Sequence, residues 1–394
     1  MKSIFITLAL AVTVAVTSFT ALAATPTITG VTAQQRYPWN GKVDISYTVT
    51  GDIAAEAKQR AVFTSLKVTA IDKVANTTNI ATQLSGDTAL TAGTHKFVWD
   101  MNAEGLTFKS SNVVFNVSCE TTPATYCVID LSAGANATSY PVTYLAEPPS
   151  GGFNVDAYKT SKLVLKRIEA GTFMMGGLYN VTLTKPYYCG VFEVTQKQYE
   201  LVMGNNPSSA KGDMRPVETV SWNMIHGHVS IYNWPTVTSV DPSKFVGRLQ
   251  SHTGLNFDLP TEAQWEYACR AGTTSAYNNG GASEDDLKLL GRYIGNLSDN
   301  KGGYSGAHTV VGSYLPNAFG LYDMHGNVCE WCLDYDGILV DGMTDPQGPS
   351  SGVYRIRRGG GWDGDATFCT SSNRDQYEWN DGSSFGFRIV RTLP

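Results

Sequence analysis

The feature that most limits what this chain can fold into is a change of hydrophobic pattern near residue 118. Before that point apolar and polar residues alternate over short stretches, as in residues 43–49, and the Gly51-Asp52 pair that follows is a turn signal. Alternation of this kind is typical of strands with one buried face. Residues 24–118 are therefore predicted to form an all-β sandwich of the immunoglobulin or fibronectin kind. Further strand candidates are residues 62–71, 95–99 and 113–117.

The next stretch, residues 119–160, is rich in Ser, Thr, Ala, Pro and Gly. Its clearest break is the run from Pro148 to Gly152, in which five residues of turn-forming type follow one another. Such a composition favours a linker, and we predict one here.

From residue 161 to 394 the pattern mixes short strands with short helices. Strand candidates are residues 163–168, 171–176, 181–183 and 192–194. Thr195 and Thr261 each precede a helical stretch and have a glutamine three residues later, which is the spacing of a capping box. Long periodic segments are too few for a doubly wound sheet. We therefore expect an α+β domain with a large irregular fraction.

Residues 1–23 have the pattern of a cleavable secretory signal. Lys2 precedes an apolar stretch, and Ala21-Leu22-Ala23 is a small-x-small site that predicts cleavage before Ala24. The apolar stretch is short for a bilayer span, and no basic cluster follows it, so a stable membrane anchor is not expected. The prediction is a periplasmic or secreted protein.

The charge balance argues against a nucleic-acid partner. The chain has 29 basic and 35 acidic residues, a formal charge of −6, whereas nucleic-acid binding favours a basic face. The seven cysteines are interpreted in an oxidising compartment. Cys119 and Cys127 are predicted to form a local disulfide. The other five are Cys189, Cys269, Cys329, Cys332 and Cys369, and their pairing stays open.

Several motifs of the second half occur in the order known from one family. The chain resembles the formylglycine-generating enzymes, also called sulfatase-modifying factors, over roughly residues 160–394. The resemblance implies an α+β fold related to C-type lectins, with little regular structure, and it says nothing about residues 24–150. The motifs are residues 171–176 (GTFMMG), 193–195 (EVT), 215–217 (RPV), 259–267 (LPTEAQWEY), 320–328 (GLYDMHGNV), 330–331 (EW), 358–360 (RGG) and 386–388 (GFR).

The family's activity is the oxidation of a sulfatase cysteine to formylglycine, with dioxygen and copper(I), and two thiols five positions apart hold the copper. Thiolates suit copper(I) because both are soft. Here Cys369 occupies the second thiol position, but the first position is Gly364. The serine that follows the Arg-Gly-Gly motif in the family is replaced here by Gly361. A glycine supplies no ligand, so copper-dependent oxidase activity is not expected.

Other departures from the family pattern support this expectation. Cys329 stands where the family has a tryptophan that resembles an active-site wall. Either Cys329 or Cys332 could approach Cys369 and form a relocated thiol pair, and the rival interpretation is a Cys332–Cys369 disulfide. Cys269 lies where some relatives have a paired cysteine, but Ile389 stands at the partner position, so Cys269 is predicted to be a buried free thiol.

The resemblance also implies calcium as a cofactor. Calcium binds carboxylate and carbonyl oxygens in irregular loops. At the first site, Asp323 and Glu330 would supply side-chain oxygens, and Gly326 and Val328 would supply carbonyls. The second site would begin at Asn296 and Leu297, with Asp299 nearby, although its later half, residues 301–304, has no carboxylate.

Two hypotheses for function follow. In the first, the chain is an exported family member without oxidase activity, steadied by calcium, that binds a protein or glycan ligand. In the second, it is a sulfatase-maturation oxidase with a rearranged thiol site, and its partner is a sulfatase polypeptide. His226 and His228 are interpreted as surface histidines. The aromatic residues of the segment 377–381 are placed in the core, with a ligand groove as the alternative.

Overall fold

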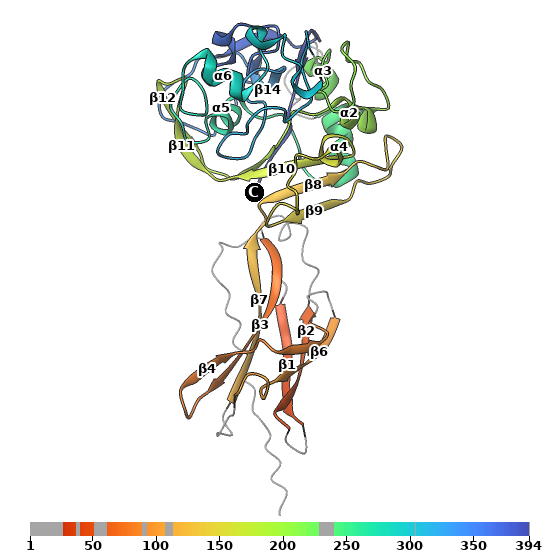
Figure 1. Cartoon of the computed structure of the whole chain (residues 1–394), viewed down its shortest axis with the longest axis vertical. Helices are drawn as coiled ribbons and strands as arrows, with labels where there is room; N and C mark the ends of the chain where they lie inside the picture. The colour runs from red at the N-terminus through yellow and green to blue at the C-terminus, as the bar shows by residue number, and fades with distance from the viewer. Residues whose placement is uncertain are drawn as a thin grey trace, which may run out of the picture. The chain divides into compact units, whose positions relative to one another are not determined.

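Two compact units make up the chain, one ending at Ala124 and the other beginning at Thr125 (Figure 1). The predicted signal, residues 1–23, lies outside the described residues. In the described ranges, no helix is long and apolar enough to cross a lipid bilayer. The computed structural model describes residues 27–36, 40–50, 61–88, 93–106, 113–227, 240–303 and 305–393.

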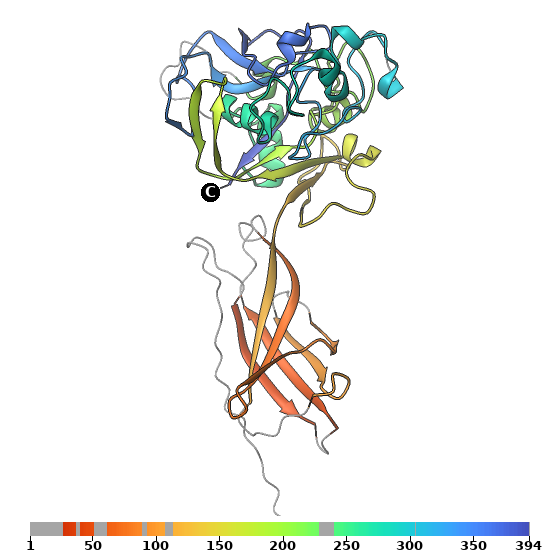
Figure 2. The ribbon, with the colours of Figure 1, turned by 60° about the vertical axis from the view of Figure 1, so that its left-hand side comes forward.

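The N-terminal unit is a sandwich of two antiparallel sheets, with strand orders β1-β2-β6-β5 and β4-β3-β7. Tyr47 and Trp99 from the first sheet share one apolar core with Phe115 from the second. The alternation of residues 43–49 is seen directly, since every second side chain is buried. The predicted sandwich is confirmed. Its strands, red to orange in Figure 2, are β1 (Thr27–Gln35), β2 (Lys42–Thr50), β3 (Ala61–Asp72), β4 (Thr77–Ile80), β5 (Leu84–Gly86), β6 (Gly93–Asp100) and β7 (Val113–Pro123).

The predicted linker, residues 119–160, is wrong for much of its length. β7 continues to Pro123, and β8 (Tyr126–Asp130) and β9 (Val142–Leu145) belong to a sheet of the C-terminal unit. β8 pairs with β10 (Lys162–Ile168) and buries Cys127, Val128 and Ile129. Burial on both strand faces gives a short apolar run without alternation, and the turn-rich residues around it hid this strand from sequence reasoning.

In its described residues, the C-terminal unit contains three small sheets instead of one large one. Their strand orders are β19-β13-β10-β8-β9, β11-β12-β15 and β17-β16-β14-β18. Irregular loops join them, which confirms the predicted α+β class. The further strands are β11 (Gly171–Met175), β12 (Tyr179–Leu183), β13 (Tyr187–Gly190), β14 (Cys329–Tyr335), β15 (Met343–Thr344), β16 (Tyr354–Arg358), β17 (Asp375–Glu378), β18 (Phe385–Gly386) and β19 (Val390–Thr392).

Both predicted capping boxes are present. Thr195 accepts from the Gln198 amide at 3.2 Å while the Gln198 side chain accepts from the Thr195 amide at 2.9 Å. Thr261 and Gln264 do the same at the start of α5 (Glu262–Arg270). In the described part of the chain, the 3₁₀ turns are η1 (Asp156–Lys159), η3 (Ile294–Asn296), η4 (Lys301–Gly303) and η5 (Ala366–Cys369). The α-helices are α2 (Gln196–Met203), α3 (Trp222–Ile225), α4 (Phe245–Thr253), α5 (Glu262–Arg270) and α6 (Glu284–Leu290).

The strand predicted at residues 192–194 is absent. Val194 exchanges single backbone hydrogen bonds with two different segments, donating to Phe387 and accepting from Val217, both at 2.9 Å. Because these bonds go to separate parts of the chain, no ladder forms. The segment is nevertheless fully buried, which explains its apolar pattern.

Two buried arginines cross the core of the C-terminal unit and fix its loops. Arg358, at the end of β16, donates to Glu266 and to Glu262 on α5, at 2.5 and 3.1 Å. Arg388, just after β18, donates to both carboxylate oxygens of Glu330 on β14, at 2.7 and 2.5 Å. All these side chains are almost fully buried. The loops carrying the candidate site residues are thus anchored by charged pairs.

Candidate functional site

The segment from Arg358 to Cys369 is a tight turn that leads from β16 into η5. Gly359 and Gly360 have φ values of 93° and 68°, in the region that favours glycine. A Cβ on Gly360 would lie 2.8 Å from Cys369 Sγ and from the carbonyl of Phe368. Glycine is therefore required at 360 for Cys369 to lie against the turn.

Cys369 is fully buried at the end of η5. Its side chain packs with Tyr277, Leu287, Leu290 and Tyr293. Burial raises the pKa of the Cys369 thiol, and the nearby Cys329 thiol adds to the rise. At neutral pH the thiol is neutral, which is the form that neither attacks an electrophile nor binds a soft metal readily.

The position predicted to lack the second thiol, Gly364, has room for a side chain. A Cβ there would lie 3.5 Å from Gly361 O and 3.7 Å from the Cβ of Phe368, which are ordinary contacts. Its backbone φ is not in the left-handed region either. The backbone conformation at position 364 therefore does not require glycine and would accept a cysteine.

Cys329 borders the same turn from β14. Its thiol donates to the carbonyl of Arg358 at 3.3 Å, and its side chain is partly exposed. Burial by its neighbours raises the pKa of the Cys329 thiol to about 12, although the Arg357 guanidinium opposes the rise. Of the two cysteines at this turn, Cys329 is the accessible one.

Neither the predicted Cys119–Cys127 disulfide nor the Cys332–Cys369 disulfide left open by the sequence is seen in the described part of the chain. Cys332 and Cys369 are free cysteines that lie in different apolar clusters, one with Trp265 and one with Tyr277. Cys127 is also free, since its side chain points into the core beneath β8, while the side chain of Cys119 lies outside the described residues. Cys269 is a buried free thiol, as predicted.

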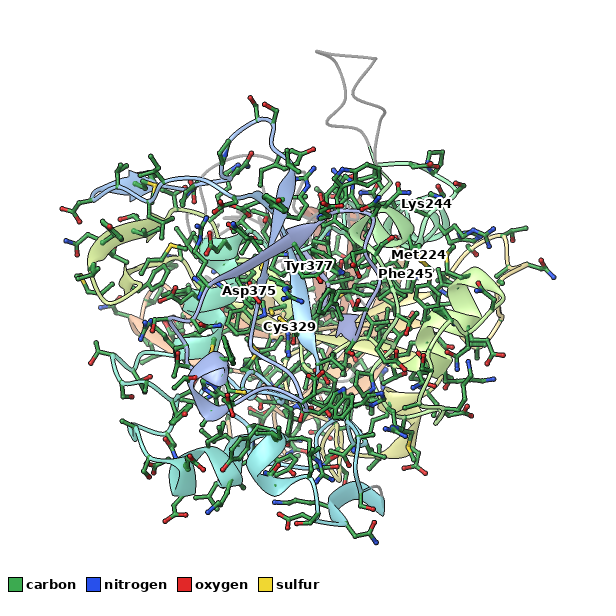
Figure 3. All side chains as sticks on the ribbon, turned by 90° about the horizontal axis from the view of Figure 1, so that it is seen from above. Met224, Lys244, Phe245, Cys329, Asp375 and Tyr377 are labelled. Carbon is green, nitrogen blue, oxygen red and sulfur yellow. The ribbon has the colours of Figure 1, made fainter. Side chains whose placement is uncertain are left out.

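An aromatic face surrounds Cys329. Tyr377 on β17 and Phe385 on β18 meet edge to face with ring centroids 5.2 Å apart, and the Arg357 guanidinium lies 3.8 Å from the Phe385 centroid. Asp375 pairs with Arg357 at 2.6 Å. Figure 3 looks onto this face and shows Tyr377, Asp375 and Cys329 near its centre. Tyr377 is exposed and so is not the core residue that was predicted, whereas Trp379 of the same segment is half-buried and packs against the core, as predicted.

The first predicted calcium site does not fit a calcium ion. Both oxygens of Glu330 are taken by Arg388, and Trp265 Nε1 donates to one of them at 2.8 Å. Asp323 Oδ2 accepts from the Gly312 amide at 2.6 Å, and only Asp323 Oδ1 is buried without a partner. A guanidinium already supplies the positive charge that the metal would bring. We therefore assign no role to the carbonyls of Gly326 and Val328 in binding calcium.

The second predicted calcium site is also closed by hydrogen bonds. Asn296 Oδ1 accepts from the Tyr293 amide at 2.9 Å, and its backbone carbonyl accepts from buried Arg292 at 2.5 Å. The carbonyl of Leu297 accepts from the Gly306 amide at 2.8 Å. Here too an arginine stands where the cation was expected. Across the described residues, no group of three or more His, Cys, Asp or Glu side chains could hold a metal.

Sequence reasoning missed a third carboxylate in this region, Glu193. It accepts from the Asn327 side chain at 2.6 Å and from the Val328 amide at 3.1 Å, and it is fully buried. Burial, together with the charges of Asp323 and Glu330, raises the pKa of Glu193 well above its ordinary value. Glu193 was part of a family motif, but only its contacts reveal that three buried carboxylates share the charge of Arg388.

Replacing Asp323 with asparagine is expected to stabilise the C-terminal unit at pH 8. Burial raises the pKa of Asp323 from 3.8 to about 6, which corresponds to a penalty of about 3 kcal/mol once the carboxylate is ionised. Because the folded pKa is the higher one, the penalty is absent below pH 3.8 and complete above pH 6. Asparagine keeps the acceptor for Gly312 and tolerates the φ of 56° at this position.

Urea unfolding of Asp323→Asn and the parent at pH 8 and pH 4 measures this effect. The free energy of unfolding of the variant minus that of the parent should be at least about 1 kcal/mol larger at pH 8 than at pH 4, since asparagine does not titrate. The exposed Asp285→Asn variant serves as the matched control and should show no such gain. An equal loss at both pH values would mean that Asp323 is a structural acceptor without charge strain.

His226 is not a surface residue. It is buried, stacks on Trp222 with ring centroids 4.4 Å apart, and lies 3.3 Å from Asp258 Oδ1. A half-buried carboxylate on one side and an indole on the other explain its burial without a metal. His228 lies outside the described residues.

Comparisons with known proteins agree with the motifs. Residues 156–393 match the family model described as the sulfatase-modifying factor enzyme 1-like domain. The chaperone protein LppX of Paenibacillus barcinonensis is 31% identical over 242 residues, covering 54% of this chain and 82% of LppX. The formylglycine-generating enzyme of Mus musculus is 31% identical over 146 residues, covering 34% of this chain and 38% of the mouse protein.

One solved structure with this likeness is the Treponema denticola variable protein 1. It is 29% identical, covers 59% of this chain and 96% of its own, and has a TM-score of 0.46. The chain thus spans less than half the length of the mouse enzyme but most of LppX and of the Treponema protein.

Proposed function

Because the chain belongs to the sulfatase-modifying factor family, we propose that it is an exported member that binds a polypeptide and does not oxidise cysteine. Export is supported by residues 1–23, whose charged start, apolar stretch and small-x-small ending are those of a secretory signal. The periplasm and the cell exterior are both consistent with this signal. Membership alone does not decide the activity, because function depends on the site and not on the fold.

A single observation supports the proposal that the chain has no oxidase activity. The turn from Arg358 to Cys369 offers one thiol where copper(I) needs two, and that thiol is fully buried. Gly364 leaves space for a side chain, so the thiol was not excluded by packing. A buried neutral thiol without a partner holds copper(I) poorly.

A polypeptide ligand is supported by two independent points. The first is LppX, 82% of whose length is covered by the match to this chain. LppX bears the name of a chaperone, and a chaperone acts on polypeptides. The face around Cys329 exposes Tyr377 on the edge strand β17, and the Arg357 guanidinium lies 4.5 Å from the centroid of its ring. Exposed tyrosine and arginine are enriched where proteins meet.

The alternative function is a cysteine oxidase with a relocated thiol pair. The observation in its favour is that Cys329 and Cys369 both border the turn at Gly360. Its substrate would be a sulfatase polypeptide, as in the family. It requires both thiols to ionise although burial raises the pKa of each.

Copper(I) titration of the mature chain, followed by turnover of a Cys-x-Pro-x-Arg peptide under oxygen, tests the proposal. We expect no stoichiometric copper and no aldehyde product. Tight binding of one copper ion with aldehyde formation would replace the proposal by the alternative. Repeating the titration with Cys329→Ser would then show whether Cys329 supplies the second thiol.

A further inference from the structure

A cavity of about 400 Å³ opens beside the N-terminus of α5. The residues that line it include none of the Arg358–Cys369 turn or of the aromatic face around Cys329. The loop between β14 and β15, the start of α5 and Arg374 all contribute to its lining. A volume of this size suits a small organic ligand or one long side chain.

The walls of the cavity are mostly aliphatic. Met175 on β11 and Met343 on β15 line it, together with Leu339 and Pro349 from the loops on either side of β15. Ile338 stands at the mouth with 91% of its surface exposed. An isoleucine so exposed, beside two flexible thioethers, offers apolar surface for an aliphatic ligand.

A buried carboxylate lies in the cavity wall. Asp334 is 3% exposed, and its Oδ2 accepts from the Glu262 amide at 2.7 Å. Within the described residues, no ion pair includes Asp334. The charge of Arg355 acts on it, but that guanidinium is held between the rings of Trp222 and Tyr335, at 3.8 and 3.3 Å from their centroids.

The only other charged lining residues are Glu262 and Arg374, and they pair with each other at 2.7 Å. Arg374 also pairs with Asp336. Arg374 is therefore already engaged by two carboxylates, of which Glu262 is shared with Arg358. An anion entering the cavity would meet Asp334 without a free cation, whereas a ligand cation would find an unpaired carboxylate.

We propose that this cavity binds a primary ammonium group carried on an aliphatic stem, with the ammonium on Asp334 and the stem along Met343 and Ile338. Two sources share this chemistry: the side chain of a lysine in a polypeptide, and a free alkylamine. The inference does not depend on the proposed function, because the cavity and the aromatic face share no residue.

Binding should depend on pH through Asp334. Burial raises the pKa of Asp334 to about 7, and the neighbouring Glu262 adds to the rise while Arg355 opposes it. The other charged lining residues, Glu262 and Arg374, are held in an ion pair with each other, and Arg374 also pairs with Asp336 outside the lining. The carboxylate that receives the ammonium is thus ionised above pH 7 and protonated below it, so affinity falls as the pH is lowered.

Calorimetric titration of the mature chain with three probes tests the inference. Nα-acetyl-lysine methylamide represents the lysine source, n-pentylammonium the free amine, and Nα-acetyl-norleucine methylamide lacks the charge. We expect one or both amines to bind at pH 8, at least about tenfold more tightly than the norleucine compound, which is the usual effect of a hydrogen bond to a charged group. At pH 5.5 their binding should weaken at least about tenfold.

Variants locate the site. Asp334→Asn keeps an acceptor for the Glu262 amide and should weaken amine binding at least about tenfold, whereas exposed Asp285→Asn should not change it. Ile338→Lys, at an exposed position that leaves the fold intact, should weaken amine binding by repulsion.

Preference for the lysine compound over pentylammonium identifies the polypeptide source, and the reverse identifies a free amine. No binding of either amine at pH 8, equal binding of the norleucine compound, or unchanged binding by Asp334→Asn would overturn the inference.

Discussion

Replacing Arg388 with methionine should lower the free energy of unfolding of the C-terminal unit by about 3 to 5 kcal/mol, the range found when one partner of a buried ion pair is removed. Arg388 is fully buried and donates to both oxygens of Glu330 and to the carbonyls of Gly190 and Tyr322, both at 3.0 Å. Without it, Glu330, Asp323 and Glu193 would face one another with no guanidinium between them.

Denaturant unfolding of the single and double variants measures this. Arg388→Met combined with Glu330→Gln should be less destabilised than the sum of the two single variants, because the glutamine removes the unpaired charge and still accepts from Trp265. Lys197→Met breaks a surface ion pair with Glu200 and should lose less than about 1 kcal/mol. A loss for Arg388→Met no larger than that of Lys197→Met would show that the core tolerates the three carboxylates without their cation.

The parts of the fold that sequence reasoning predicted correctly are those specified locally. The capping boxes at Thr195 and Thr261 need only four consecutive residues, and the alternation of residues 43–49 needs only one strand. The strand at residues 126–130 was missed for the converse reason. Its burial on both faces comes from β10 and from the core beneath, which lie far along the chain.

The candidate site shows the same limit more sharply. The motifs pointed to Glu330 and Asn296 as calcium ligands, but their partners, Arg388 and Arg292, already supply a positive charge at each position. Glu330 and Arg388 are 58 residues apart, and no local pattern links them. In the same way, the spacing of Cys332 and Cys369 permitted a disulfide that the packing of two separate apolar clusters does not allow.

Replacing Gly364 with cysteine should give the protein a copper(I) site that the parent lacks. The new side chain would stand next to Phe368, the residue before Cys369, with ordinary contacts of 3.5 to 3.7 Å. Two thiols on one turn would then offer the low coordination number that copper(I) prefers, and metal binding would deprotonate them despite the raised pKa of Cys369. We expect affinity for copper(I) at least about 100-fold above that of the parent.

Competition with a copper(I) chelator measures this change, and Gly360→Cys is the matched control. It adds the same thiol four residues earlier, but at a φ of 68° and with its Cβ 2.8 Å from the Phe368 carbonyl, so it should fail to fold stably. The free energy of unfolding of Gly364→Cys should lie within about 1 kcal/mol of the parent's, as expected for a substitution without a clash. A well-folded Gly364→Cys protein that binds no more copper(I) than the parent would show that burial of Cys369, and not the missing thiol, is what abolishes the metal site.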